Sequence, residues 1–348
     1  RDAQPLMSNY IPVLQHPVFF TGLLVFAAGF TLLIINSMVF MAPVGPWMAG
    51  EGAIRFGLNA AAISAAVALI CFAWSYSRMP GYLEGEPYFE LLFWGGGHVL
   101  QFTYTLLMLV SWLWLASHAG LSLPTTPRVV LVILFVGLAC VFVSPLIYLA
   151  FPLTSLEHVE LFTWLMRWGG SLATLPLAIA IIVGLLRYGG SSQVETLARS
   201  ALQCSLFLFG IGGFIGFMIS GSNVTIPAHY HGSIVGVTLA LMGVCYLLLP
   251  RLGYPLRDVR MAIWQPVVYG GGQLLHVSGL VWSGGYGVQR KVAGAAQNLD
   301  SIERVLGMGL MGLGGLVSSI GGLLFLIVVW RAFSAGRHET SDETEGGQ

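Results

Sequence analysis

Charged residues are scarce in this sequence: Asp, Glu, Lys and Arg together make up 9% of its 348 residues. Soluble domains carry about 25% charged residues, so the chain lacks the polar surface that a water-facing globule needs. Acidic and basic residues also balance, at 15 each, which leaves no excess charge to attract a charged macromolecule. These absences exclude a soluble enzyme, a nucleic-acid-binding protein and a disordered chain.

Cysteine is rare as well. The four cysteines lie far apart, each within an apolar run, and none forms a Cys-x-x-Cys motif. This spacing argues against a disulfide framework, so we expect the thiols to serve as small apolar groups in helix packing. The cysteines are Cys71, Cys140, Cys204 and Cys245.

Apolar residues are abundant instead, at 56% of the sequence, and they give a mean hydropathy of +0.81. About 20 consecutive apolar residues cross a bilayer as a helix, and such runs recur from end to end. We therefore predict an all-α polytopic membrane bundle over residues 1–336 and a polar, disordered tail over 337–348. The nine predicted spans are 17–41, 53–79, 88–117, 128–151, 159–187, 198–220, 227–250, 261–286 and 304–333.

Glycine is the other abundant residue, with 45 copies. Small residues let membrane helices approach one another closely. We expect such packing at 95–97, at 270–272 and along the last span, where glycines cluster between 307 and 315.

The loops predict the orientation of the bundle, because Lys and Arg concentrate on the cytoplasmic side of a membrane. Five of these residues fall on the side of the N-terminus and nine fall on the opposite side, and only Arg167 lies within a span. We therefore expect an integral protein of a bacterial inner membrane whose C-terminus is cytoplasmic.

Two histidines in the seventh span carry the strongest functional signal. His229-Tyr230-His231 follows Pro227 in an apolar run without charge. Successive helical residues turn by about 100°, so side chains two apart point to nearly opposite faces. The two imidazoles cannot share one metal ion, but each can ligate a different metal on its own side of the helix. Intramembrane histidines without such a role are costly.

Further polar groups extend this pattern. His98 lies in the middle of the third span, where it is either a metal ligand or a structural histidine bonded to a backbone carbonyl. His276 lies in the eighth span, and Arg290 and Lys291 follow it toward the N-terminal side of the membrane. Paired cations at the edge of a bundle suit haem propionates, although they are also common as interfacial anchors.

Together these residues resemble subunit I of the haem-copper oxidase superfamily, which includes terminal oxidases and nitric oxide reductases. Residues 226–232 look like that family's tenth helix, 92–98 like its sixth and 275–291 like its eleventh. The nine spans match helices four to twelve of a twelve-helix core, and residues 1–5 look like the loop after the third helix. The resemblance implies that helices one to three, including the one with the other ligand of the low-spin haem, fall outside this sequence.

The resemblance implies two haems and a role for each matching residue. His229 would be the axial ligand of the high-spin, active-site haem, and His231 would be one axial ligand of the low-spin haem. His98 would bind a second metal, either copper or non-haem iron. Arg290 and Lys291 would hold the haem propionates.

The sequence departs from the family where the seventh helix should supply a His-His pair. The matching stretch, 144–150, contains no histidine, and the position of a family tyrosine four residues after His98 is Phe102. His158 or Glu157 could replace the missing ligands only if the loop before the fifth span folded inward. The departure puts an ordinary three-imidazole copper site in doubt.

Carboxylates could also serve this pocket. Glu90 lies about two helical turns before His98, and Glu160 lies at the start of the fifth span. Either could bind a metal or carry protons, and either could be a helix-start acid favoured by the helix dipole. The remaining pocket candidates are His276, Tyr104 and Gln101.

The resemblance implies a membrane oxidoreductase that reduces O2 or NO at the high-spin haem, which receives electrons from the low-spin haem. We expect contacts with membrane lipid and with other subunits of a respiratory complex, including a cytochrome c or copper-containing electron donor, and no nucleic acid. The missing histidine pair leaves open a non-catalytic electron-transfer or scaffold subunit with a decayed second-metal site. A haem-free transporter or channel would require discontinuous helices and charges along a pathway.

Overall fold

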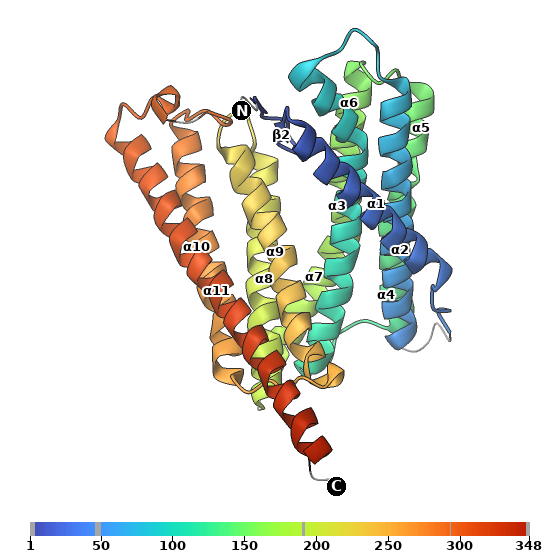
Figure 1. Cartoon of the computed structure of the whole chain (residues 1–348), viewed down its shortest axis with the longest axis vertical. Helices are drawn as coiled ribbons and strands as arrows, with labels where there is room; N and C mark the ends of the chain where they lie inside the picture. The colour runs from blue at the N-terminus through green and yellow to red at the C-terminus, as the bar shows by residue number, and fades with distance from the viewer. Residues whose placement is uncertain (1–3, 46–49, 190–191, 293, 346–348) are drawn as a thin grey trace. The chain divides into compact units, whose positions relative to one another are not determined.

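The protein is almost entirely helical (Figure 1). The computed structural model describes residues 4–45, 50–189, 192–292 and 294–345, and of residues 336–345 it describes the backbone. Within these ranges, eight helical segments are long and apolar enough to cross a membrane. The protein is therefore an all-α polytopic membrane protein, as the sequence predicts. Residues 1–3 of the expected N-terminal loop and residues 346–348 of the expected tail lie outside the described residues.

A short hairpin precedes the helices, in which β1 (Pro5–Leu6) pairs antiparallel with β2 (Val13–Leu14). Of the elements that follow, η1 is a single π-helical turn and η2 and η3 are 3-10 turns. The helices are α1 (Pro17–Val39), α2 (Gly50–Arg78), α3 (Gly85–His118), α4 (Pro127–Val141), α5 (Val143–Ala150), α6 (Leu156–Trp164), η1 (Leu165–Gly169), α7 (Gly170–Arg187), α8 (Gln193–Met218), α9 (Thr225–Leu248), η2 (Pro250–Leu252), α10 (Val259–Gly285), η3 (Gly294–Gln297) and α11 (Ile302–Glu345).

Each predicted span contains a helix, but three differ from the expectation. The span 261–286 is α10, a helix of 27 residues that falls outside the eight apolar segments because glycines and polar residues dilute its hydropathy. The span 128–151 divides at Phe142, because the ring of Pro145 clashes with the carbonyl one turn earlier. The span 159–187 contains the π-helical turn η1, directly before Gly170.

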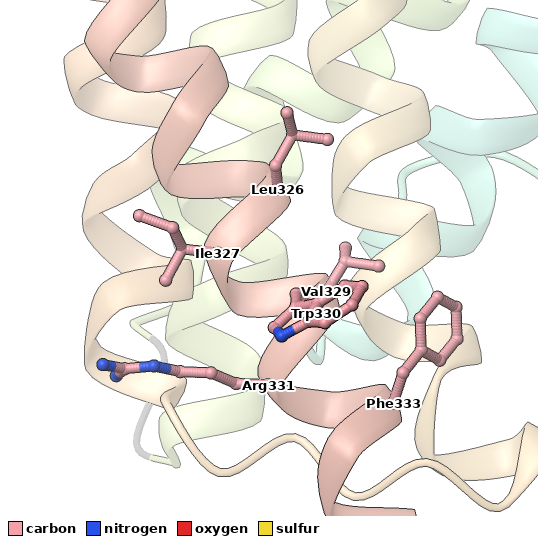
Figure 2. A pocket seen from close by; sticks show the side chains of 6 residues that line it. All are labelled: Leu326, Ile327, Val329, Trp330, Arg331 and Phe333. Carbon is pink, nitrogen blue, oxygen red and sulfur yellow. The ribbon is translucent and has the colours of Figure 1, made fainter.

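The last helix is longer than the sequence predicts. α11 runs to Glu345, so the backbone is helical through most of the expected disordered tail. A helix that is already nucleated extends at little cost, which accounts for the difference. Six residues between Leu326 and Phe333 line a surface hollow of about 520 Å³ on this helix (Figure 2). The Nη1 atom of Arg331 in this stretch donates to Asp258 Oδ1, just before α10, at 3.1 Å.

The chain folds into two compact units. The first comprises the described residues up to Val110 together with Leu123–Ile182. The second comprises Ser111–Ser122 together with the described residues from Val183 onward. α1 has almost no buried side chains and is therefore suited to contact lipid. The other helices of each unit pack around the core of that unit.

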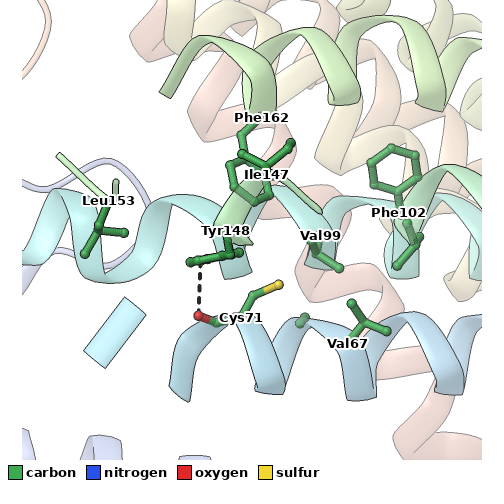
Figure 3. Packing of buried hydrophobic residues seen from close by; sticks show 10 residues of the cluster. Val67, Cys71, Val99, Phe102, Ile147, Tyr148, Leu153 and Phe162 are labelled. Carbon is green, nitrogen blue, oxygen red and sulfur yellow. Dashed lines mark hydrogen bonds between the residues drawn. The ribbon is translucent and has the colours of Figure 1, made fainter. Parts of the chain in front are cut away.

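The core of the first unit joins α2, α3, α5 and α6 around Tyr148 (Figure 3). The Tyr148 hydroxyl donates to the carbonyl oxygen of Cys71 at 3.1 Å and lies 2.7 Å from Ser75 Oγ. Glycines let α3 approach its neighbours, because a Cβ at Gly95 would meet Tyr148 and one at Gly97 would lie 2.6 Å from the Tyr10 ring. The predicted close packing at residues 95–97 is confirmed.

In the second unit, glycines form the contacts between neighbouring helices. A Cβ at Gly232 of α9 would lie 2.6 Å from the Cα of Gly212 in α8. A Cβ at Gly272 of α10 would lie 2.5 Å from a backbone nitrogen of α11, and Gly314 of α11 faces the backbone of α10 in the same way. The prediction for the last span holds in part, since Gly309 in that helix faces open space. Figure 1 shows α10 and α11 lying side by side along most of their length.

Candidate functional site

The two histidines of the His-x-His motif contact different helices. Both lie in the second turn of α9 and are half-buried. The Nδ1 atom of His229 donates to the carbonyl oxygen of Gly212 in α8 at 2.7 Å. The His231 ring instead packs edge-on against His276 of α10, with ring centroids 4.5 Å apart. The structure therefore confirms that the two imidazoles point to opposite sides of one helix.

The His229 ring packs closely against a glycine of α8. A Cβ at Gly216 of α8 would lie 2.8 Å from Nδ1 and 2.9 Å from Cε1 of the imidazole, closer than ordinary contact allows. Because a carbonyl oxygen only accepts, the bond to Gly212 assigns the proton to Nδ1 and leaves a lone pair on Nε2. A hydrogen bond from one ring nitrogen to a backbone carbonyl is typical of histidines that ligate metals through the other nitrogen.

His276 is held in a comparable way. Its Nδ1 atom donates to the carbonyl oxygen of Met311 in α11 at 2.9 Å. The bond fixes the orientation of the imidazole that packs against His231. His276 therefore ties the face of α9 that carries His231 to both α10 and α11.

The cations expected to bind propionates lie at the end of α9 that carries the motif. The loop after α10 pairs with the start of α9, because Val224 N donates to Val288 O at 3.1 Å. This pairing positions Arg290, whose Nη1 donates to the hydroxyl of Tyr230 at 3.3 Å and whose Nε donates to Ser222 Oγ at 3.1 Å. Lys291 follows with a φ of 62°, a left-handed conformation that is uncommon for a residue other than glycine.

His98 of α3 belongs to the first unit and is buried. Its Nδ1 atom donates to the carbonyl oxygen of Trp94, one turn earlier, at 2.7 Å. This is the backbone bond expected of a structural histidine, but it again leaves the lone pair on Nε2 for a ligand. The structural and metal-binding interpretations of His98 are therefore compatible.

The N-terminal segment contributes a residue to this site that the sequence gave no reason to select. The Tyr10 hydroxyl lies 2.7 Å from His98 Nδ1, and Gln101 Nε2 donates to the same hydroxyl at 3.2 Å. Asn9 Nδ2 donates to Glu90 Oε2 at 2.6 Å. Gln101 thus shares the Tyr10 hydroxyl with His98, while Glu90 is bonded to the preceding residue of the same segment.

His158 is buried in the interior of the first unit. From the sequence, His158 could replace the missing metal ligands only if its loop folded inward. That condition is met for His158: it lies in the first turn of α6, is 0% exposed and packs edge-on against the Tyr148 ring at a centroid distance of 4.8 Å. Two other candidates point outward, since Tyr104 is 48% exposed and Glu160 is exposed as well. Phe102, at the position of the family tyrosine, is buried in the apolar core.

The candidate residues fall into two groups, one in each unit. The described residues contain no cluster of three or more His, Cys, Asp and Glu side chains that could hold a metal ion. The first group is His98, Glu90, Gln101 and His158; the second is His229, His231, His276, Arg290 and Lys291.

The chain is similar in sequence to proteins of two bacteria. It is 28% identical over 366 aligned residues to an uncharacterized protein of Rickettsia prowazekii, with 92% of this chain and 70% of that protein covered. It is 29% identical over 257 residues to an uncharacterized protein of Aquifex aeolicus, with 72% of this chain and 61% of that protein covered. No protein-family model matches the chain.

Proposed function

We propose that this protein is a haem-containing membrane oxidoreductase subunit that resembles the catalytic subunit of cytochrome c oxidases and nitric oxide reductases. In this proposal His229 is the axial ligand of a high-spin haem and His231 is one axial ligand of a low-spin haem. The bound haems would supply the redox chemistry for the reduction of O2 or NO. The proposal also places the protein in a bacterial inner membrane with its C-terminus in the cytoplasm.

The observation that carries the proposal is the pair of imidazoles on opposite faces of α9. His229 has its Nδ1 proton bonded to a backbone carbonyl and its ring packed against Gly216, which is the orientation typical of a histidine that ligates a metal through Nε2. His231 packs against a second, separately anchored imidazole on the other face. A helix whose only purpose was packing would gain nothing from two such histidines in an apolar environment.

The other residues of this unit have roles that follow from their chemistry. Arg290 would pair with a haem propionate by charge-assisted hydrogen bonds, and its bond to Tyr230 holds the guanidinium at the end of α9 where the motif lies. Lys291 would supply a second cation there. The apolar helices would exclude water from the reacting centre and so strengthen these charge interactions.

Partners complete the proposed assembly. The low-spin haem requires a second axial ligand, which the resemblance assigns to a helix outside the given sequence. Electrons would arrive from a cytochrome c or copper-containing subunit, and His98 would bind the second metal, either copper or non-haem iron. The alternative is a non-catalytic electron-transfer or scaffold subunit, which the lack of a three-residue metal cluster among the described residues favours.

Haem analysis of single-histidine variants tests the proposal. We expect the purified protein to contain haem, His229→Ala to lose the carbon monoxide-binding haem and His231→Ala to lose the low-spin signal. His118→Ala is the matched control, because His118 lies at the end of α3 and bonds to Trp114 O and Arg251. If both motif variants keep the full haem content of the control, the ligand assignment is wrong.

A further inference from the structure

Two buried glutamines of α10 differ in the partners of their side-chain amides. Gln265 is bonded at both ends, because its oxygen accepts from the Tyr246 hydroxyl at 3.2 Å and its nitrogen donates to the carbonyl oxygen of Gly321 at 3.1 Å. The amide of Gln273 is hydrogen-bonded instead to the imidazole of His231 in α9. Gln273 is 8% exposed, and its amide oxygen has no other partner among the described residues.

The His231 ring depends on this amide more than its neighbours depend on any side chain. The imidazoles of His229 and His276 each donate an Nδ1 proton to a backbone carbonyl oxygen. Within the described part of the chain, no backbone carbonyl accepts from the His231 ring, and the Gln273 amide is its hydrogen-bond partner. Histidines that ligate metals are oriented by a hydrogen bond from the ring nitrogen that does not bind the metal. For His231, a side chain provides that bond.

The orientation of the amide decides which ring nitrogen of His231 carries the proton. The two ends of an amide have nearly the same shape but opposite hydrogen-bonding roles. If the Gln273 nitrogen faced the imidazole, it would require an unprotonated ring nitrogen there, and the proton on the other nitrogen would block coordination. If the oxygen faces the imidazole, it accepts the proton of the nearer nitrogen and leaves a lone pair on the other. A buried acceptor without a donor costs about 1–3 kcal/mol, so burial of the oxygen favours the second arrangement.

A second residue of the same helix face restricts the His231 ring. His276 follows Gln273 by three positions, which places both on one face of α10. Its ring packs edge-on against His231 with a centroid distance of 4.5 Å, and its Nδ1 is bonded to the carbonyl oxygen of Met311 in α11 at 2.9 Å. A Cβ at Gly314 of α11 would clash with the backbone nitrogen of His276, so the two helices are in close contact here. The support of His231 is therefore built on two packed helices.

We infer that Gln273 is a positioning residue for His231: its amide oxygen accepts the proton of one ring nitrogen and so leaves the lone pair of the other nitrogen for a metal. The inference rests on the proposed function, in which His231 is an axial ligand of the low-spin haem. It adds the residue that sets the tautomer and the orientation of that ligand. Such a hydrogen bond also raises the basicity of the imidazole. A more basic ligand stabilises ferric relative to ferrous iron, so Gln273 lowers the midpoint potential of a haem bound at His231.

Redox titration of the purified protein tests the inference without an activity assay. Gln273→Met keeps the length of the side chain but removes the amide. We expect the midpoint potential of the low-spin haem to rise and the haem affinity at His231 to fall by at least about tenfold. Gln273→Glu keeps an oxygen acceptor and should stay close to the wild type in both properties. Gln265→Met is the matched control, because Gln265 lies about 12 Å away along the same helix and is bonded to Tyr246 and Gly321.

The outcomes separate this inference from the haem proposal. A rise in potential in Gln273→Met that is absent from Gln273→Glu and Gln265→Met would support the inference. The same potential and haem affinity in Gln273→Met and Gln265→Met would overturn it and leave the haem assignment intact.

A preparation without haem would contradict the proposed function, and the hydrogen bond is then tested by itself. The ring nitrogens of His231 are observed by ¹⁵N NMR of histidine-labelled protein and identified by their absence from His231→Ala. We expect these signals to shift in Gln273→Met and to stay in place in Gln265→Met, whereas unchanged signals in both would overturn the inference. Gln273→Leu takes the place of Gln273→Met in either experiment if the methionine variant does not fold.

Discussion

The substitution Gly216→Ala directly tests the close packing of His229 against α8. The added methyl group would lie 2.8 Å from His229 Nδ1, which is 0.6 Å short of the 3.4 Å at which ordinary contact begins. Either α8 must move away from α9 or the imidazole must turn off the Gly212 carbonyl. Overpacking of this kind costs about 1–3 kcal/mol, and the turn would also redirect Nε2.

Gly213→Ala is the matched control, because a Cβ at that neighbouring position meets nothing within 4 Å. Both variants gain the same advantage of alanine over glycine in a helix, about 1 kcal/mol. The difference between them therefore isolates the steric effect, and we expect Gly216→Ala to be less stable than Gly213→Ala by about 1–3 kcal/mol.

Two assays on the same preparations measure the effect: thermal unfolding in detergent and the carbon monoxide difference spectrum of the reduced protein. Gly216→Ala should unfold at a lower temperature and show a smaller spectral change than Gly213→Ala. Equal stability and equal carbon monoxide binding in the two variants would refute the close contact between Gly216 and His229, and with it the main support for His229 as a ligand.

Three further predictions concern stability. Tyr148→Phe should destabilise the protein by about 1–3 kcal/mol, because it leaves Ser75 Oγ without its buried partner; an unchanged unfolding temperature would contradict this. Gly272→Ala should destabilise by about 1–3 kcal/mol and Gly271→Ala should not, because a Cβ meets the α11 backbone only at the first position. Asp258→Asn should cost at most about 1 kcal/mol in a denaturation experiment, because the Asp258 carboxylate and its Arg331 partner are partly exposed.

Helical periodicity explains what the sequence could predict of the site. Apolar length sufficed to locate the spans, and the turn of about 100° per residue sufficed to place His229 and His231 on opposite faces. The glycines at 95–97 signalled close packing of α3 correctly. Each of these properties depends on residues that are neighbours in the sequence.

Contacts between distant segments could not be predicted in this way. Tyr10 reaches His98 across 88 positions, and nothing in its own surroundings marks it as a site residue. The buried position of His158 depends on how α5 and α6 pack. The sequence alone could therefore state this position only as a condition. The break at Phe142 had a local signal in Pro145, but the continuous apolar run outweighed it in the prediction of a single span.

The most direct test of the central claim is a carbon monoxide difference spectrum of the purified, dithionite-reduced protein. Carbon monoxide binds only a ferrous haem with an open coordination position, so a haem held by His229 alone on the protein side must respond. We predict haem absorbance with a clear carbon monoxide-induced shift. Haem absorbance without a shift would instead favour the electron-transfer subunit, and a preparation without haem would contradict the account.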